Sequence, residues 1–159
     1  MSASPGDAGK QAALTVDSSR RRAGWAMALT AGPAMSGAMF CTVAGGGSGW
    51  TDTAGWLAGG LSLNAVGFWL LTRRAAAGRR AFAAASNAGA GMQDAARAYL
   101  GGVQAALPWL VGGAWVGSVG MAAGGGWWPG TATAAAMAMI AASLPTSRGL
   151  GAFVQRSVG

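Results

Sequence analysis

The sequence lacks histidine altogether and has a single cysteine, Cys41, among its 159 residues. With one thiol per chain, no disulfide can form within one copy, and the usual nitrogen and sulfur ligands of a zinc site are missing. Carboxylates are equally scarce: the four acidic residues, Asp7, Asp17, Asp52 and Asp94, lie too far apart in sequence for a local acid–base pair. We therefore expect a protein that is not an enzyme and that holds neither metal nor cofactor.

Charged residues are also scarce. Charged residues make up 9% of the chain, whereas ordinary soluble domains are about 25% charged. Alanine and glycine fill the chain instead, with 39 and 29 residues. The net charge of +7 would suit a nucleic-acid-binding protein if the basic residues followed one face or stripe. They fall in short clusters beside charge-free runs, a distribution typical of a membrane protein.

Several apolar runs are long enough to cross a bilayer core, which takes about 20 residues. They cover residues 23–44, 53–71, 98–123 and 127–144. The runs are continuous and show no period of two, which favours helices over a barrel. The predicted fold is an all-α membrane protein of four transmembrane helices, arranged as two helical hairpins at 23–71 and 98–144.

The basic residues predict the orientation. All eleven lie before the first run, between the second and third, or after the fourth, and the opposite loops at 45–52 and 124–130 hold only Asp52. By the positive-inside rule both termini are cytoplasmic, in a multi-pass protein of the inner cell membrane. Three cytoplasmic segments follow: a flexible basic tail at 1–22, a basic linker at 72–97 and a second tail at 145–159.

The beginning of the sequence has a second interpretation. Ser-Arg-Arg-Arg at 19–22, followed by an apolar run, resembles a twin-arginine export signal. The apolar part of such a signal is about 7–15 residues long, and this run has 22. A retained first span is the favoured interpretation, and a cleaved signal is the alternative.

The two predicted hairpins resemble each other around their outer loops. Ala-Gly-Gly-Gly at 44–47 recurs at 123–126, and Thr-x-Thr-Ala at 51–54 recurs at 131–134. A duplicated hairpin would explain the repeat. Chance similarity in a chain so rich in alanine and glycine would explain it equally well.

Polar side chains inside the runs are few and uncharged. Since no run contains Asp, Glu, Lys, Arg or His, the sequence argues against a proton-coupled transporter or pump. Asn64 and Gln104 cost most to leave unpaired in hydrocarbon, so each is expected to bond a neighbouring helix. A polar pore lining is the alternative role for these residues.

Small residues recur four apart within the runs. Gly55 with Gly59, and Gly113 with Gly117, would let helix backbones approach closely. We expect these glycines to pack helices within one copy, between copies, or both. The expected partners are the lipid bilayer and either a second copy or another membrane protein, and we identify no small-molecule substrate.

The arginine clusters have two interpretations. They comprise Arg20, Arg21, Arg22, Arg73, Arg74, Arg79 and Arg80. The first interpretation is a topology anchor that keeps these segments in the cytoplasm, which we favour. The second is a contact with an acidic partner, either anionic lipid headgroups or nucleic acid held at the membrane.

Two resemblances bear on function. Gly-Gly-Leu-Ser-Leu-Asn at 59–64, followed by Arg73 and Arg74, resembles the second span of the ATP synthase protein I family. That resemblance implies a four-span assembly factor of the rotor ring. The whole chain, with its polar arginine-bearing head and spans rich in Ala, Gly and Trp, is similar in type to the small hydrophobic spread proteins of conjugative plasmids in mycelial actinobacteria. This second resemblance implies action beside a DNA translocase.

The predicted function is that of a non-catalytic multi-pass membrane protein that acts by helix association in a membrane complex, in conjugal plasmid transfer or spread. The alternatives are the assembly factor of a rotary ATP synthase and a holin-like pore-forming protein. Phage holins share the same general type, but usually carry a more strongly basic C-terminal tail than Arg148 and Arg156 provide.

Overall fold

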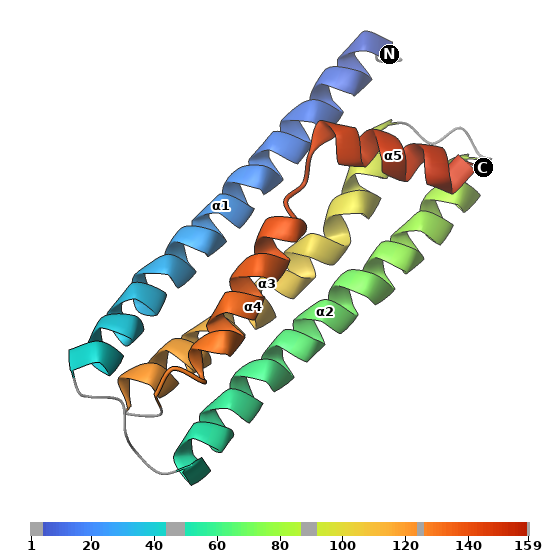
Figure 1. The fold of residues 1–159 in the computed structure, drawn as a ribbon. Coiled ribbons are helices and arrows are strands. Elements are labelled where there is room, and N and C mark those ends of the chain that lie inside the picture. The colour runs from blue at the N-terminus through green and yellow to red at the C-terminus, as the bar shows by residue number, and fades with distance from the viewer. Residues whose placement is uncertain (1–4, 44–49, 87–91, 124–125, 159) are drawn as a thin grey trace.

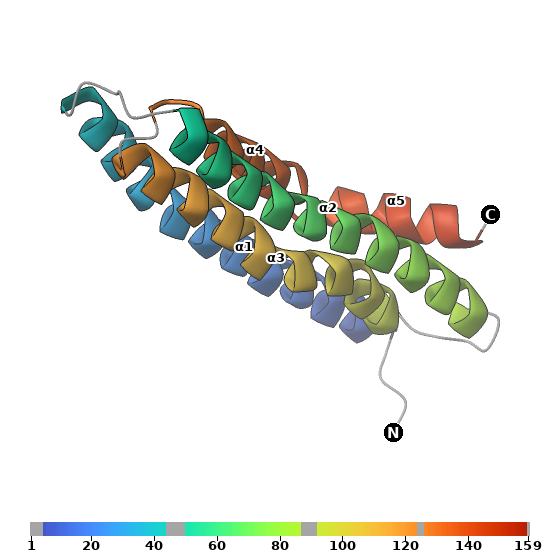
Figure 2. The ribbon, with the colours of Figure 1, turned by 90° about the horizontal axis from the view of Figure 1, so that it is seen from below.

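The computed structural model describes residues 5–43, 50–86, 92–123 and 126–158, and these residues are almost entirely helical. The helices are α1 (Pro5–Val43), α2 (Trp50–Ser86), α3 (Met92–Ala122), α4 (Gly130–Ala142) and α5 (Ser147–Val158). In Figures 1 and 2, α1 to α4 run along one common axis and α5 lies across one end of the bundle. The prediction of an all-α fold is confirmed over the described residues.

Three helices, α1, α2 and α3, are long and apolar enough to cross a membrane. The fourth predicted span is present as a shorter apolar helix, because α4 has 13 residues. At 1.5 Å per residue α4 is about 20 Å long, whereas a bilayer core is about 30 Å thick. Segments outside the helix make up the rest of the predicted run at 127–144.

Local sequence explains why α4 is short. Pro129 precedes its first residue, and Gly126 adopts a φ of 67°, a conformation that favours glycine. At the other end, the Ser143 N–H donates to the carbonyl oxygens of Met139 and Ile140. Pro145 follows, and it cannot continue a helix because it lacks a backbone donor.

The helix α3 is the centre of the bundle, since α1, α2 and α4 all pack on it. Within the described residues α1 and α2 form no packed pair, and Figure 1 shows them on opposite sides of α3 and α4. The two helices of the predicted first hairpin at 23–71 pack on α3 and not on each other. The outer-loop residues 44–49 and 124–125, which carry part of the predicted repeat, lie outside the described residues.

Small residues allow the segments of the bundle to approach closely. A Cβ atom at Gly60 of α2 would lie 2.7 Å from Ala132 Cβ of α4, and one at Gly117 of α3 would lie 2.5 Å from the Pro129 oxygen. Real Cβ atoms do not come so close, so only glycine fits at either place. Close backbone approach is the main source of helix packing in lipid, where apolar side chains gain little by leaving their surroundings.

The described parts of the tail expected to be flexible, of the basic linker and of the C-terminal segment are largely helical. Residues 5–22 belong to α1, 73–86 extend α2, and most of the C-terminal segment forms α5. Alanine favours helix at this density, and the extended helices also bury apolar side chains against one another. That burial stabilises helices which sequence alone leaves marginal.

We expect Gly117→Ala to destabilise the folded chain by about 1–3 kcal/mol, because the added methyl group collides with backbone and Thr133. The matched control is Gly101→Ala on the same helix, where a Cβ meets nothing within 4 Å. The control should not destabilise the chain, because alanine favours helix over glycine by up to about 1 kcal/mol. Unfolding of the detergent-solubilised protein by sodium dodecyl sulfate measures both, and equal effects would contradict the packing described here.

Candidate functional site

Contacts between helices place the ends of the charge-free segments at one level. Gln104 Nε2 of α3 donates to Ser19 Oγ of α1 at 3.2 Å. Two residues away on α3, a Cβ at Gly102 would lie 3.5 Å from the Leu71 oxygen of α2. The arginine clusters that follow Ser19 and Leu71 in sequence therefore stand at the same height on the bundle.

The charge-free part below this level is the apolar slab, defined as residues 23–43, 53–72, 103–122 and 130–142. On α3 it is about 20 residues and about 30 Å long, the thickness of a bilayer core. Large apolar side chains point outward around it, among them Trp25, Met35 and Val43 with exposures of 71%, 75% and 77%. Exposing such a belt of apolar side chains to water is unfavourable, whereas lipid tails accommodate it.

The remaining helical part is the basic head, defined as residues 5–22, 73–86, 92–102 and α5. It holds all eleven basic residues and three of the four acidic ones, a formal charge of +8. Two ion pairs are described in it, between Arg21 and Asp17 at 3.2 Å and between Arg97 and Asp94 at 3.3 Å. Both pairs are exposed and contribute little to stability, so the head keeps a strong positive potential.

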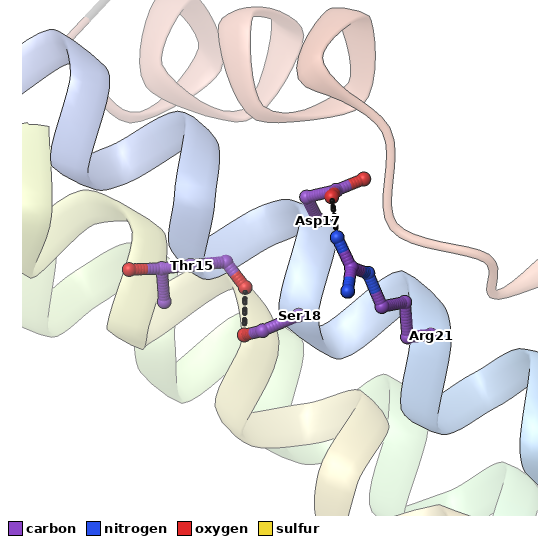
Figure 3. A network of polar contacts seen from close by, with 4 residues as sticks. All are labelled: Thr15, Asp17, Ser18 and Arg21. Atoms are coloured by element: carbon purple, nitrogen blue, oxygen red, sulfur yellow. Dashed lines mark hydrogen bonds and ion pairs between the residues drawn. The ribbon is translucent and has the colours of Figure 1, made fainter.

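The pair on α1 belongs to a short polar row along that helix. Figure 3 shows Arg21 reaching back to Asp17, with Ser18 Oγ donating to the Thr15 oxygen at 2.9 Å. All of these bonds lie within three or four residues on one helix. They order side chains on the surface of α1 and connect this helix to no other element.

The head has a hydrophobic core of its own, which the sequence analysis missed. The Phe153 ring of α5 lies 6.1 Å from Phe82 of α2 and 5.5 Å from Tyr99 of α3, measured between ring centroids. Buried residues from α1 and α3 complete the core: Ala12, Val16, Ala95 and Ala96. A usable signal was present in the sequence, because Leu150, Phe153 and Val154 follow the spacing of one helix face.

Both predicted polar side chains of the slab bond a neighbouring helix. Asn64 is 3% exposed, and its Nδ2 donates to the Ala132 oxygen of α4 at 2.8 Å. Its Oδ1 has no partner among the described residues and lies where a Cβ at Gly113 would collide with it. Gln104 sits at the upper edge of the slab in the contact with Ser19 described above.

A second buried polar contact joins α3 to α4 and was not predicted. Ser118 Oγ and Thr133 Oγ1 both donate to the Ala114 oxygen, at 2.8 and 2.9 Å, and lie 3.3 Å from each other. Nothing in the alanine and threonine run at 131–136 distinguished Thr133 from its neighbours.

The structure separates the four predicted packing glycines. Gly113 and Gly117 are buried inside the chain, against α2 and α4. A Cβ at Gly59 would make an ordinary contact with Val116 Cγ1 at 3.5 Å, and a Cβ at Gly55 would meet nothing within 4 Å. Only the α2 pair therefore faces outward.

The predicted arginines divide between several environments. Arg73 lies over the Trp69 ring, 4.9 Å from its centroid, at the boundary of slab and head. Arg79 and Arg80 line a groove of about 310 Å³ together with Arg156 of α5. Arg20 lines a different groove, of about 580 Å³, in which Lys10 and the exposed Leu14 also take part. Of the remaining three members of the set, Arg21 pairs with Asp17, and Arg22 and Arg74 are exposed on the surface.

Comparison with protein-family models, with curated proteins and with solved structures gives no match for this chain. The arrangement presents two kinds of surface: helix faces of small and apolar residues around the slab, and arginine-lined grooves on the head. The first kind can bind another helix and the second can bind an anion.

We expect Phe153→Ala to loosen α5 from the head, because a buried phenylalanine contributes about 3 kcal/mol when it is fully packed. Trypsin cleavage after Arg148 and Arg156 should then accelerate by about tenfold or more, since it requires local opening. Gln155→Ala, on the exposed face of the same helix, is the matched control. Unchanged cleavage of the Phe153 variant would show that these rings do not hold α5 in place.

Proposed function

We propose that this chain is a four-span protein of the inner cell membrane, with both termini in the cytoplasm, and that it acts without chemistry of its own as a subunit of a membrane complex. The segregation of every basic residue into the head supports the orientation. The position of α4 along the bundle axis supports a fourth crossing of the membrane. Asn64 and Thr133 connect α4 to the middle of α2 and α3, and the segments beside α4 extend it toward both edges of the slab.

The uncovered face of α1 is the observation that carries the association. This helix packs on α3 and α4 along one side, and its opposite side bears four small residues at intervals of four: Gly24, Ala28, Gly32 and Ser36. A Cβ at either glycine would meet nothing within 4 Å. Such a face lets a second helix approach closely in lipid.

A second copy of the chain is the partner we assign to this face. Copies in one membrane share one orientation, so α1 helices that meet across a two-fold axis run parallel, with each residue near the axis opposite itself. The glycines buried against α2 and α4 are already occupied, which leaves the outward stripe of α1 for this contact. Gly55 lies outward too, but near the far edge of the slab.

The process that we propose for the complex is plasmid transfer, on the resemblance in type to spread proteins. The translocase that this process requires would meet the α1 side of the head. There, the groove of Lys10, Arg20 and exposed Leu14 combines positive charge with an apolar residue. A DNA translocase gene beside the gene for this chain would support the assignment.

The topology is tested by labelling single cysteines in a Cys41→Ser background. We expect Trp127→Cys, at the loop end of the bundle, to react with an impermeant thiol reagent from outside intact cells. Ala84→Cys, in the head, should react only after the membrane is opened. Both positions are exposed in the structure, and the reverse pattern would contradict the proposed orientation.

The association is tested by disulfide cross-linking in native membranes. In the Cys41→Ser background, Ala28→Cys should cross-link to its copy, whereas Ala65→Cys on the exposed face of α2 should not. Adding Gly32→Leu should lower the cross-linked fraction about tenfold, the result of losing about 1–2 kcal/mol of helix contact. Gly55→Leu is the matched control and should change it little. Efficient cross-linking in the Gly32→Leu background would rule out this interface.

A further inference from the structure

Three arginines from two helices gather beside the slab. Arg79 and Arg80 of α2 and Arg156 of α5 line one groove, with Ala76 and Ala83 as its floor. The two ion pairs described in the head involve other arginines. Arginine binds phosphate oxygens through paired N–H groups, so three of them around one groove form a strong site for a phosphate.

An apolar cavity adjoins this groove. It has a volume of about 220 Å³ and is lined by residues from four helices, among them Leu71, Val103, Leu144 and Phe153. Leu71 and Val103 belong to the rim of the slab, and Phe153 belongs to the core of the head. Arg79 lines both the cavity and the arginine groove, so the two spaces meet at one side chain.

The height of this pair of spaces matches a lipid headgroup. Arg79 lies seven residues beyond the last slab residue of α2, which is about 10 Å along the helix. The polar layer of a bilayer adds roughly 5–7 Å on each side of its core. A long arginine side chain bends back toward that layer while its stem packs on the helix.

We propose that the groove and cavity between α2 and α5 form a binding site for one anionic phospholipid. The phosphate lies among Arg79, Arg80 and Arg156, and the upper part of an acyl chain enters the cavity beside Leu71 and Val103. Charge and apolar surface at the boundary of the membrane suit this amphiphile, and basic recesses between transmembrane helices bind such headgroups in other proteins. The inference rests on the membrane location in the proposed function and is independent of association through α1.

Native mass spectrometry of the detergent-solubilised protein measures the binding. We expect phosphatidylglycerol to bind about tenfold more tightly than phosphatidylcholine with the same chains, because only the former carries net negative charge. The triple variant Arg79→Gln, Arg80→Gln, Arg156→Gln should lose about tenfold in affinity for phosphatidylglycerol. The control triple variant Lys10→Gln, Arg97→Gln, Arg148→Gln removes the same charge elsewhere on the head and should lose less than about twofold.

Two further experiments distinguish binding of a lipid from binding of free phosphate. Ala142→Phe places a ring at the mouth of the cavity, from an exposed position that leaves every arginine in place. This variant should bind phosphatidylglycerol several-fold more weakly. In the unmodified protein, millimolar inorganic phosphate should not displace the lipid. Displacement by phosphate, with no effect of Ala142→Phe, would show an anion site without a lipid chain and would overturn the proposal.

Equal losses in both triple variants would show general charge attraction, and they would also overturn the proposal. Tighter binding of a short DNA duplex, lost in the groove variant alone, would make the groove a nucleic-acid site instead. Circular dichroism verifies that each variant is folded. The measurement in detergent depends on neither orientation nor cross-linking, so its failure is distinguishable from failure of the proposed function.

Discussion

The close approach of three helices to α3 is the constraint on which the rest of the structure depends. Lipid provides no hydrophobic drive to bring helices together, so contact distance and buried hydrogen bonds must hold the bundle. Gly113 and Gly117 supply the distance, while Asn64 and Thr133 supply the bonds to neighbouring backbone. A larger side chain at either glycine would separate the helices and break those bonds together.

The head depends on the same axis, because its helices are continuations of the slab helices. The continuations of α2 and α3 place Phe82 and Tyr99 where Phe153 of α5 contacts both rings. Different interactions stabilise the slab and the head. The slab is held by small residues and buried polar bonds, whereas the head is held by an ordinary apolar core that water can drive together. The arginines of the head lie around this core, at the ends of the long apolar helices.

The outward surfaces have a different role from the inward ones. Neighbouring glycines can belong to either surface: Gly59 and Gly60 are adjacent, yet only Gly60 would collide with another helix if it carried a Cβ. The inward glycines pack the helices of one chain against each other. What remains outside, chiefly the stripe on α1 and the grooves of the head, is the surface available for contacts with other molecules.

From the sequence by itself came the all-α class, the apolar runs, the gathering of positive charge on one side and the value of Asn64 and Gln104 as helix contacts. These follow from local rules, since hydrocarbon excludes charge and requires every backbone group to be paired within a helix. Tertiary structure alone decided that α1 and α2 part to either side of α3 and that α5 closes the head. It also decided which of many equivalent glycines face inward. In a chain so rich in alanine and glycine, small residues occur on every face of every helix, and only the packing partners distinguish one face from another.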